Sequence, residues 1–165
     1  MPRTRIIPDA KVFSAIRTLL EQGGDKAVSF ASVAAATGLA PPTLVQRYGS
    51  RDGMVSVAHL AAWRGLEQVT DDAIGNTADK GPQALLKALP ATEVERLATQ
   101  LRDPDLAQRA TAWRFKVESA LALRLGGGPK SKESAALLFA AWQGQALWSA
   151  GASAFRLKEA VKRLT

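Results

Sequence analysis

Apolar residues recur along this chain at intervals of three and four, which is the spacing of one face of an amphipathic helix. No segment shows the two-residue alternation that a half-buried strand would have. The first apolar stripe consists of Phe13, Ile16, Leu19 and Leu20. Gly23 and Gly24 follow this stripe, and glycine commonly ends a helix, so the pattern predicts a helix over residues 9–22.

Capping residues predict three more helices in the N-terminal part of the chain. Ser29 is a suitable N-cap for a second helix, which Gly38 would end, and Ser50 is a suitable N-cap for a fourth. The third helix, over residues 41–48, opens on two prolines, which suit a first turn because its amides lack helical partners. A helix this short gains little stability of its own. We therefore interpret it as a segment whose function is to expose particular side chains.

The rest of the chain is also predicted to be helical. A polar stretch at residues 70–81 interrupts the pattern and is predicted to be a joint between two functional regions. Asp103-Pro104 begins a long helix, because proline suits the first turn. Two final helices are predicted over residues 131–150 and 154–164. The pattern as a whole predicts an all-α fold.

The short third helix has an apolar face and a polar face. At about 100° per residue, Leu44 and Tyr48 fall on the same side and are predicted to face the core. The outward surface and its flanks carry Pro42, Thr43, Val45, Gln46 and Arg47. Glutamine can pair with adenine, valine can contact the thymine methyl group, and threonine and arginine can hold phosphate. These side chains indicate that the helix recognises DNA. The alternative is a purely structural role, in which the helix only forms a turn between its two neighbouring helices.

A helix, a glycine-containing turn and a short second helix form the helix-turn-helix pattern, in which the second helix enters the major groove. Residues 9–60 resemble the N-terminal domain of TetR-family transcriptional regulators, through the segment SFASVAAATGLAPPTLVQRYGSRDGM at residues 29–54. The matching positions are Val33-Ala34, Gly38, Thr43-Leu44, Tyr48 and Gly49-Ser50-Arg51-Asp52. The sequence departs from the family at Ala40-Pro41-Pro42, where the family often has Ser-Lys-Gly.

This resemblance implies an N-terminal three-helix helix-turn-helix DNA-binding domain, at residues 1–52, followed by a helical effector-binding and dimerisation domain, at residues 53–165. Arg51 would contact the DNA backbone, as the equivalent basic residue does in the family, and Arg3 and Arg5 could supply a flexible arm. The residues expected to bind DNA are Ser29, Ala40, Pro41, Pro42, Thr43, Val45, Gln46, Arg47 and Arg51.

No residue from Ser134 to Phe155 is charged. The stretch is long enough to cross a bilayer, but its glutamines, glycines and serines make it a poor span, so a core helix and a dimer interface remain as interpretations. One face carries Leu138, Trp142, Gln145 and Ser149, and another carries Leu137, Ala141, Gly144 and Trp148. One of these faces can cover the chain's own core and the other a second copy. The residues expected at the dimer interface are Leu138, Trp142, Gln145, Trp148 and Ser149.

The family also has a ligand pocket in the C-terminal domain. The residues expected to line it here are Trp63, Leu86, Leu97, Leu101, Trp113 and Leu121. Apolar residues at helical spacing are more often plain core, so a small pocket and no pocket both stay open. If the pocket is present, its lining indicates a mostly apolar small-molecule effector.

Charge and composition favour some classes of function and exclude others. The chain has a net charge of +7, and residues 1–64 account for +4 of it. This positive charge slightly favours a polyanionic partner such as DNA. It has no cysteine and one histidine, so Cys-ligated zinc, thiolate catalysis and a His-rich metal site are excluded. The first residues lack the apolar core of a secretion signal, which predicts a cytoplasmic protein.

The sequence therefore predicts a homodimeric, sequence-specific DNA-binding transcriptional regulator. We expect it to bind a palindromic operator in double-stranded DNA as a repressor that a small apolar effector releases. No cofactor, metal site, catalytic residue or membrane partner is expected, so the protein is predicted not to be an enzyme. The alternative is a helical protein-interaction or small-molecule-binding module without specific DNA recognition.

Overall fold

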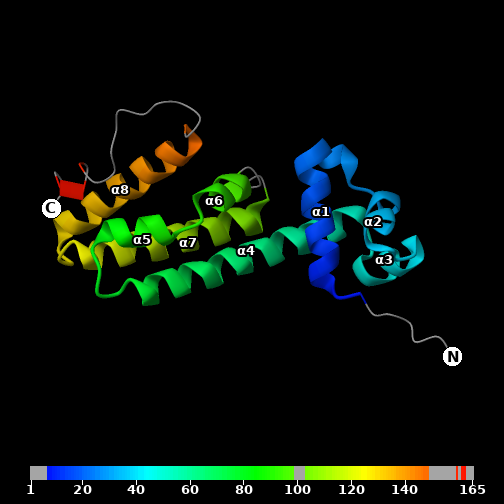
Figure 1. The fold of residues 1–165 in the computed structure, drawn as a ribbon, viewed down its shortest axis with the longest axis horizontal. Helices are drawn as coiled ribbons and strands as arrows, with labels where there is room; N and C mark the ends of the chain where they lie inside the picture. Colours follow the sequence, from blue (N-terminus) through cyan, green and yellow to red (C-terminus); the bar gives the residue numbers. More distant parts are fainter. Residues whose placement is uncertain (1–6, 99–102, 149–158, 160, 163–165) are drawn as a thin grey trace. The chain divides into compact units, whose positions relative to one another are not determined.

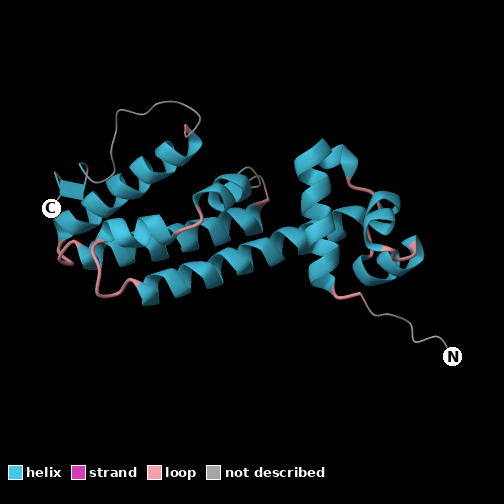
Figure 2. Cartoon of the chain, in the orientation of Figure 1, coloured by secondary structure: helices cyan, strands magenta, loops and turns pink. Residues whose placement is uncertain are grey.

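The computed structural model describes residues 7–98, 103–148, 159 and 161–162. In this part of the chain the secondary structure is helical, with loops and no strand (Figures 1 and 2). The elements, in chain order, are α1 (Asp9–Gly23), the 3₁₀ turn η1 (Asp25–Ala27), α2 (Phe30–Thr37), α3 (Pro41–Tyr48), α4 (Arg51–Asn76), α5 (Pro82–Ala88), α6 (Ala91–Ala98), α7 (Pro104–Arg124) and α8 (Pro129–Leu147). The all-α prediction is confirmed.

Contacts divide the chain into two compact units, Met1–Ala62 and Trp63–Thr165. The division falls inside α4, whose first part packs with α1, α2 and α3 and whose second part belongs to the other unit. The boundary predicted at residues 52 and 53 lies at the start of this same helix, and it stays a prediction.

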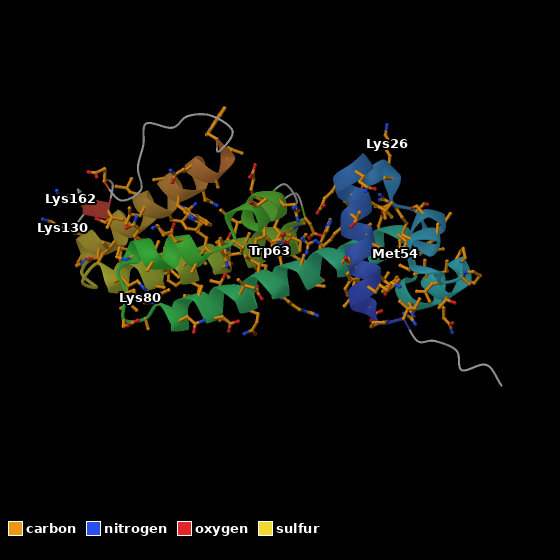
Figure 3. All side chains as sticks on the ribbon, in the orientation of Figure 1. Lys26, Met54, Trp63, Lys80, Lys130 and Lys162 are labelled. Carbon is orange, nitrogen blue, oxygen red and sulfur yellow. The ribbon has the colours of Figure 1, made fainter. Side chains whose placement is uncertain are left out.

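The first unit has an apolar core of its own. Leu44 of α3 and Met54 of α4 are fully buried in it, together with Val12 and Ile16 of α1 and Val33 of α2. Figure 3 shows Met54 within this helical cluster and Lys26 pointing away from it into solvent. Burying a side chain of this size contributes roughly 1.5–3 kcal/mol to folding. This shared core fixes the position of α3 relative to the two helices before it.

The second unit is organised around a cluster of aromatic rings. Trp113 of α7 packs edge-on against Trp63 of α4 and Phe139 of α8, with ring centroids 6.4 and 5.8 Å apart. Phe139 in turn lies 5.8 Å from Trp142. All four rings are buried. Trp113 also donates a 2.8 Å hydrogen bond from its Nε1 atom to Thr70 Oγ1, so its buried indole N–H has a hydrogen-bond partner.

The polar stretch at residues 70–81, predicted to be a joint, is mostly the end of α4, so that prediction is wrong. Thr70 and Thr77 are buried, and each hydroxyl donates a 2.7 Å hydrogen bond to the carbonyl four residues earlier. Arg124 of α7 donates to the carbonyl oxygens of Ile74 and Thr77 and thereby caps this helix end. Burial lowers the pKa of Arg124 from its ordinary value. We predicted a joint here because these residues are polar. The sequence does not show that their hydroxyls hydrogen-bond to backbone carbonyls within a helix.

After Trp148, the structure describes residues 159, 161 and 162, all of them helical. Helix α8 ends at Leu147, and most of the helix predicted over residues 154–164 lies outside the described residues. The described helices include none that combines the length and the apolar character needed to span a bilayer.

Candidate nucleic-acid interface

Helix α2 begins and ends where its capping residues predict. The Ser29 hydroxyl accepts a 3.0 Å hydrogen bond from the Ser32 amide, and the Ser29 amide donates to the Ser32 hydroxyl, so the two serines cap the helix reciprocally. At the other end Gly38 has φ 77°, the left-handed conformation that glycine adopts without steric cost. The start of the short α2–α3 connection is therefore fixed by backbone geometry.

Helix α3 is short because both of its ends are fixed. Pro41 and Pro42 occupy its first turn after the extended residue Ala40, and Gly49 has φ 74° just beyond Tyr48. The Gly49 amide donates a 2.8 Å hydrogen bond to the Val45 carbonyl and closes the last turn. Leu44 is the side chain of this helix that is fully buried, and the partly buried Tyr48 also packs against the core of the first unit.

The side of α3 opposite Leu44 is open to solvent. Pro41, Pro42, Gln46 and Arg47 are exposed, and Val45 is 44% exposed, whereas Thr43 is half-buried. Gln46 makes no hydrogen bond to another described residue, so its amide has both its donor and its acceptor available. Apart from Thr43, the residues of α3 predicted to read DNA are thus exposed, and their contact with DNA stays a prediction.

Arg47 differs from its neighbours because its guanidinium has partners within the chain. Its Nη1 atom donates a 2.9 Å hydrogen bond to the carbonyl oxygen of Ile7 and lies 3.6 Å from Asp9 Oδ1. The chain just before α1 is thereby tied to the last turn of α3. The sequence could not show this contact, since forty positions separate the two partners.

Tyr48 ties the same two segments together. Its hydroxyl donates a 2.5 Å hydrogen bond to Asp9 Oδ1, and its ring packs against Phe13 with centroids 6.1 Å apart. The side chain is half-buried, not fully buried as its helical position suggested. Burial, followed by the hydrogen bond to the Asp9 carboxylate, raises the pKa of Tyr48 to about 12.

We expect this shift to be visible directly, because Tyr48 is the protein's single tyrosine. The ordinary pKa of tyrosine is about 10, so the neutral phenol stabilises the fold below pH ~10, and this contribution is lost as the pH rises through about 12. Ultraviolet absorbance of the phenolate should show a midpoint near 12 in the native protein and near 10 in urea. A native midpoint at the ordinary value would contradict both the burial of Tyr48 and its hydrogen bond to Asp9. Tyr48→Phe should show no transition in either solvent.

Arg51, predicted to contact the DNA backbone, fastens the start of α4 to the loop before α2. Its Nε donates to the Val28 carbonyl at 3.1 Å, and its Nη2 lies 2.7 Å from Asp25 Oδ1 and also donates to the Asp25 carbonyl. Its Nη1 pairs with Asp52 at 2.8 Å. The hydrogen bond between Arg51 and Asp25 lowers the pKa of Asp25 and raises that of Arg51. A phosphate would have to compete with these partners, so the geometry favours a structural role.

Of the residues predicted to line a pocket, those that the structure describes are buried in the second unit, and their contact with a ligand stays a prediction. Trp63, Leu86, Leu97, Trp113 and Leu121 are all buried, and Leu101 lies outside the described residues. Helical spacing identified them correctly as apolar and inward-facing. It could not distinguish a lined pocket from a filled core.

An open cleft lies between α6 and α8. It has a volume of about 400 Å³ and is lined mainly by apolar and small residues, among them Val94, Ala98, Trp142 and Leu147. Glu95 and Gln143 supply its polar groups. Much of the cleft's wall is formed by alanines and a glycine, whose small size leaves the space open. Such residues form no recognisable motif, so no sequence pattern indicated this cleft.

Helix α8 buries Leu138 and Trp142 of one predicted face. Of the other predicted face, Leu137 and Trp148 are exposed, whereas Ala141 and Gly144 are half-buried. Leu138 and Trp142, predicted to lie at the dimer interface, are buried within their own chain, and their contact with a second copy stays a prediction. Gln145 is half-buried, Trp148 is 74% exposed, and Ser149 lies outside the described residues. The exposed face, here called the α8 stripe, consists of Leu137, Ala140, Gly144, Leu147 and Trp148, with Gly144 half-buried.

Within the described residues, no three or more His, Cys, Asp or Glu side chains gather in the way that could hold a metal ion.

Comparison with known proteins agrees with this architecture. No protein-family model matches the sequence, and no curated protein matches it. Among solved structures, the chain is similar to the TetR-family transcriptional regulator PfmR from Thermus thermophilus, with 18% identity and a TM-score of 0.59 over 93% of both chains. It is also similar to a protein assigned to the TetR family from a Rhodococcus species, with 19% identity and a TM-score of 0.52 over 94% of this chain and 93% of that one.

At this level of identity the likeness concerns the fold, and it extends well beyond the helix-turn-helix segment. The resemblance seen in residues 29–54 is therefore confirmed for the architecture: the chain has the fold of the TetR-family transcriptional regulators, a helix-turn-helix domain followed by a helical C-terminal domain.

Proposed function

We propose that the protein is a homodimeric, sequence-specific DNA-binding transcriptional regulator, and that it acts as a repressor released by a small apolar effector. The observation that carries this proposal is the exposed face of α3, on which Gln46 has no partner among the described residues while Leu44 and Tyr48 anchor the helix from behind. A helix held in this way can enter the major groove as a rigid unit.

Two observations support the proposed homodimer: the small size of the reading helix and the exposed α8 stripe. A single helix of eight residues contacts few base pairs, whereas two copies related by a twofold axis read two half-sites and gain selectivity. The α8 stripe offers large exposed apolar side chains, Leu137, Leu147 and Trp148, for the second copy to cover. The expected operator is accordingly palindromic.

The simplest test separates DNA binding from the alternative of a helical interaction module. Duplexes of random sequence are titrated with the protein at several salt concentrations. We expect binding that weakens linearly on a log–log plot, because arginine and lysine contacts to phosphate release counterions. A helical module whose basic charge is incidental would bind no duplex, and that outcome would rule out the proposal.

We place the effector in the α6–α8 cleft because this cleft is open and mainly apolar, whereas the described residues predicted for a pocket are buried. Trp142 and Leu147 give the cleft an apolar wall for an apolar or aromatic molecule, and Gln143 offers a hydrogen-bonding amide at its edge. Gly144 and Leu147 also belong to the α8 stripe. A ligand that shifts α8 would therefore change how two copies pack, and must bind one packing better than the other to act as an effector.

We expect the neutral apolar dye Nile red to bind in this cleft, and Ala98→Trp, which fills it, to reduce that binding by at least about tenfold, or roughly 1.4 kcal/mol. Ala112→Trp, at an exposed position of α7 outside the cleft, is the matched control and should leave dye binding unchanged. Equal dye affinity in the two variants would place the effector elsewhere. Fluorescence titration is the measurement.

A further inference from the structure

One carboxylate lies at the α6–α8 cleft without a partner in the described part of the chain. Helix α6 contributes Ala91, Val94, Glu95 and Ala98 to the wall of the cleft, which is the spacing of a single helix face. Glu95 is the charged residue among the described residues that line it. Its side chain is exposed, and it makes no ion pair or hydrogen bond with another described residue. Its negative charge is therefore available to a molecule in the cleft.

The other carboxylate of α6 differs, because it is paired within the helix. Glu93 accepts a 3.1 Å hydrogen bond from Arg96 Nη1 and forms an ion pair with it. Neither of these two residues lines the cleft. The arginine of α6 thus neutralises Glu93 and leaves Glu95 without a counter-ion on its own helix.

The opposite wall supplies no counter-ion either. From Ser134 to Trp148, α8 and its C-cap carry no charged residue. This helix contributes apolar, small and amide side chains to the cleft, among them Trp142, Gln143 and Leu147. Helices α6 and α8 pack against each other within the second unit, so both walls are held by the same fold. The charge at the cleft is therefore negative, opposite in sign to the net charge of +7 of the whole chain.

A single carboxylate beside an apolar cleft favours ligands of one charge. An anion bound there would be repelled by Glu95, whereas a cation entering a wholly apolar cleft would lose its water without compensation. Glu95 provides that compensation, and the apolar walls accept the uncharged body of the molecule. The volume of about 400 Å³ lies in the lower part of the range found for small-molecule sites, which suits a compact ligand.

We propose that the α6–α8 cleft binds lipophilic cations, in which an apolar or aromatic body carries a positively charged amine, and that Glu95 recognises this charge. The inference rests on the proposed function, and it narrows the effector from apolar molecules in general to this class. Glu95 determines specificity more than affinity, because an ion pair with an exposed carboxylate is weakened by water and salt. Most of the binding free energy comes from the apolar walls.

The test uses two dyes that share one fused-ring scaffold. Nile red is neutral, Nile blue is cationic at neutral pH, and each is titrated by fluorescence in the absence of DNA. Glu95→Gln removes the charge at the cleft, and Glu133→Gln is the matched control, because Glu133 is an exposed carboxylate of α8 outside the cleft. We expect Glu95→Gln to weaken Nile blue binding by roughly three- to fivefold and to leave Nile red binding unchanged. Glu133→Gln should bind both dyes as the wild type does.

Ala98→Trp, which fills the cleft, should weaken the binding of both dyes and thereby show that they occupy the same place. If the wild-type protein does not bind Nile blue, if Glu95→Gln binds it as tightly as the wild type, or if Glu133→Gln weakens it equally, the charge recognition assigned to Glu95 is wrong.

Duplex binding, measured without dye, separates this inference from the proposed function. Both glutamine variants should bind duplex DNA as the wild type does, since Glu95 and Glu133 lie in the second unit. Intact duplex binding without the effect of Glu95→Gln on Nile blue would overturn the inference alone. A wild-type protein that binds no duplex would overturn the proposed function, and with it the effector role of the cleft.

Discussion

Trp148→Glu is expected to convert the protein into a monomer and to weaken operator binding by about 10²–10⁴-fold, because the gain from linking two binding events would vanish. Trp148 is 74% exposed in the isolated chain and lies on the α8 stripe, so in a dimer it would be covered by the second copy. A carboxylate there would lose its water without gaining a partner, which is strongly unfavourable. The two half-sites would then be bound separately.

Leu123→Glu is the matched control for this experiment. Leu123 is also 74% exposed, but it lies on α7 and not on the α8 stripe. Light scattering at micromolar concentration should show a dimer for this variant and a monomer for Trp148→Glu. If the outcome is reversed, the two copies meet through α7; if both variants stay dimeric, the interface lies elsewhere on the chain.

Gln46→Ala is expected to cost about 1–3 kcal/mol on the preferred site and to relax the preference at one base pair in each half-site. Gln46 is exposed at the middle of α3 and has no partner among the described residues, so its amide is free to pair with a base edge. Binding to random duplexes should barely change, since phosphate contacts dominate there. Gln22→Ala, at an exposed position of α1, should leave both affinities as they are.

The Leu44→Ala variant distinguishes a loss of base recognition from a loss of folding. Leu44 is 0% exposed, so its truncation should destabilise the first unit by about 2–5 kcal/mol in thermal melts. Gln46→Ala should melt with the wild type. Should Gln46→Ala keep full discrimination at every position, Val45 becomes the better candidate for the reader, because Arg47 already has partners within the chain.

The helix boundaries of the first unit could be predicted closely because their signals are local. Serine at the start of α2, proline at the start of α3 and glycine at 38 and 49 each act on the backbone within one turn. The outward position of Gln46 followed from the same local reasoning, since helical periodicity fixes its direction once Leu44 faces the core.

What the sequence did not reveal depends on contacts between distant residues. Nothing near Arg51 indicates that Asp25 and Val28 would occupy its guanidinium, and nothing near Arg47 points to Ile7. On α8 the pattern identified two apolar faces but did not say which one the chain itself would bury. Which face of α8 is buried depends on how α6 and α7 pack against it. Helical periodicity alone carries no information about that packing.

The central claim is that two copies of α3 read two half-sites, and selection of bound duplexes from a random pool tests it most directly. The selection is run with the wild-type protein and with Gln46→Ala at one fixed salt concentration. The account predicts that wild type recovers an inverted repeat whose half-sites lie about one helical turn apart, and that Gln46→Ala recovers the same repeat with one position in each half-site degenerate. Recovery of no common motif by the wild-type protein, or of a motif that Gln46→Ala recovers unchanged, would contradict it.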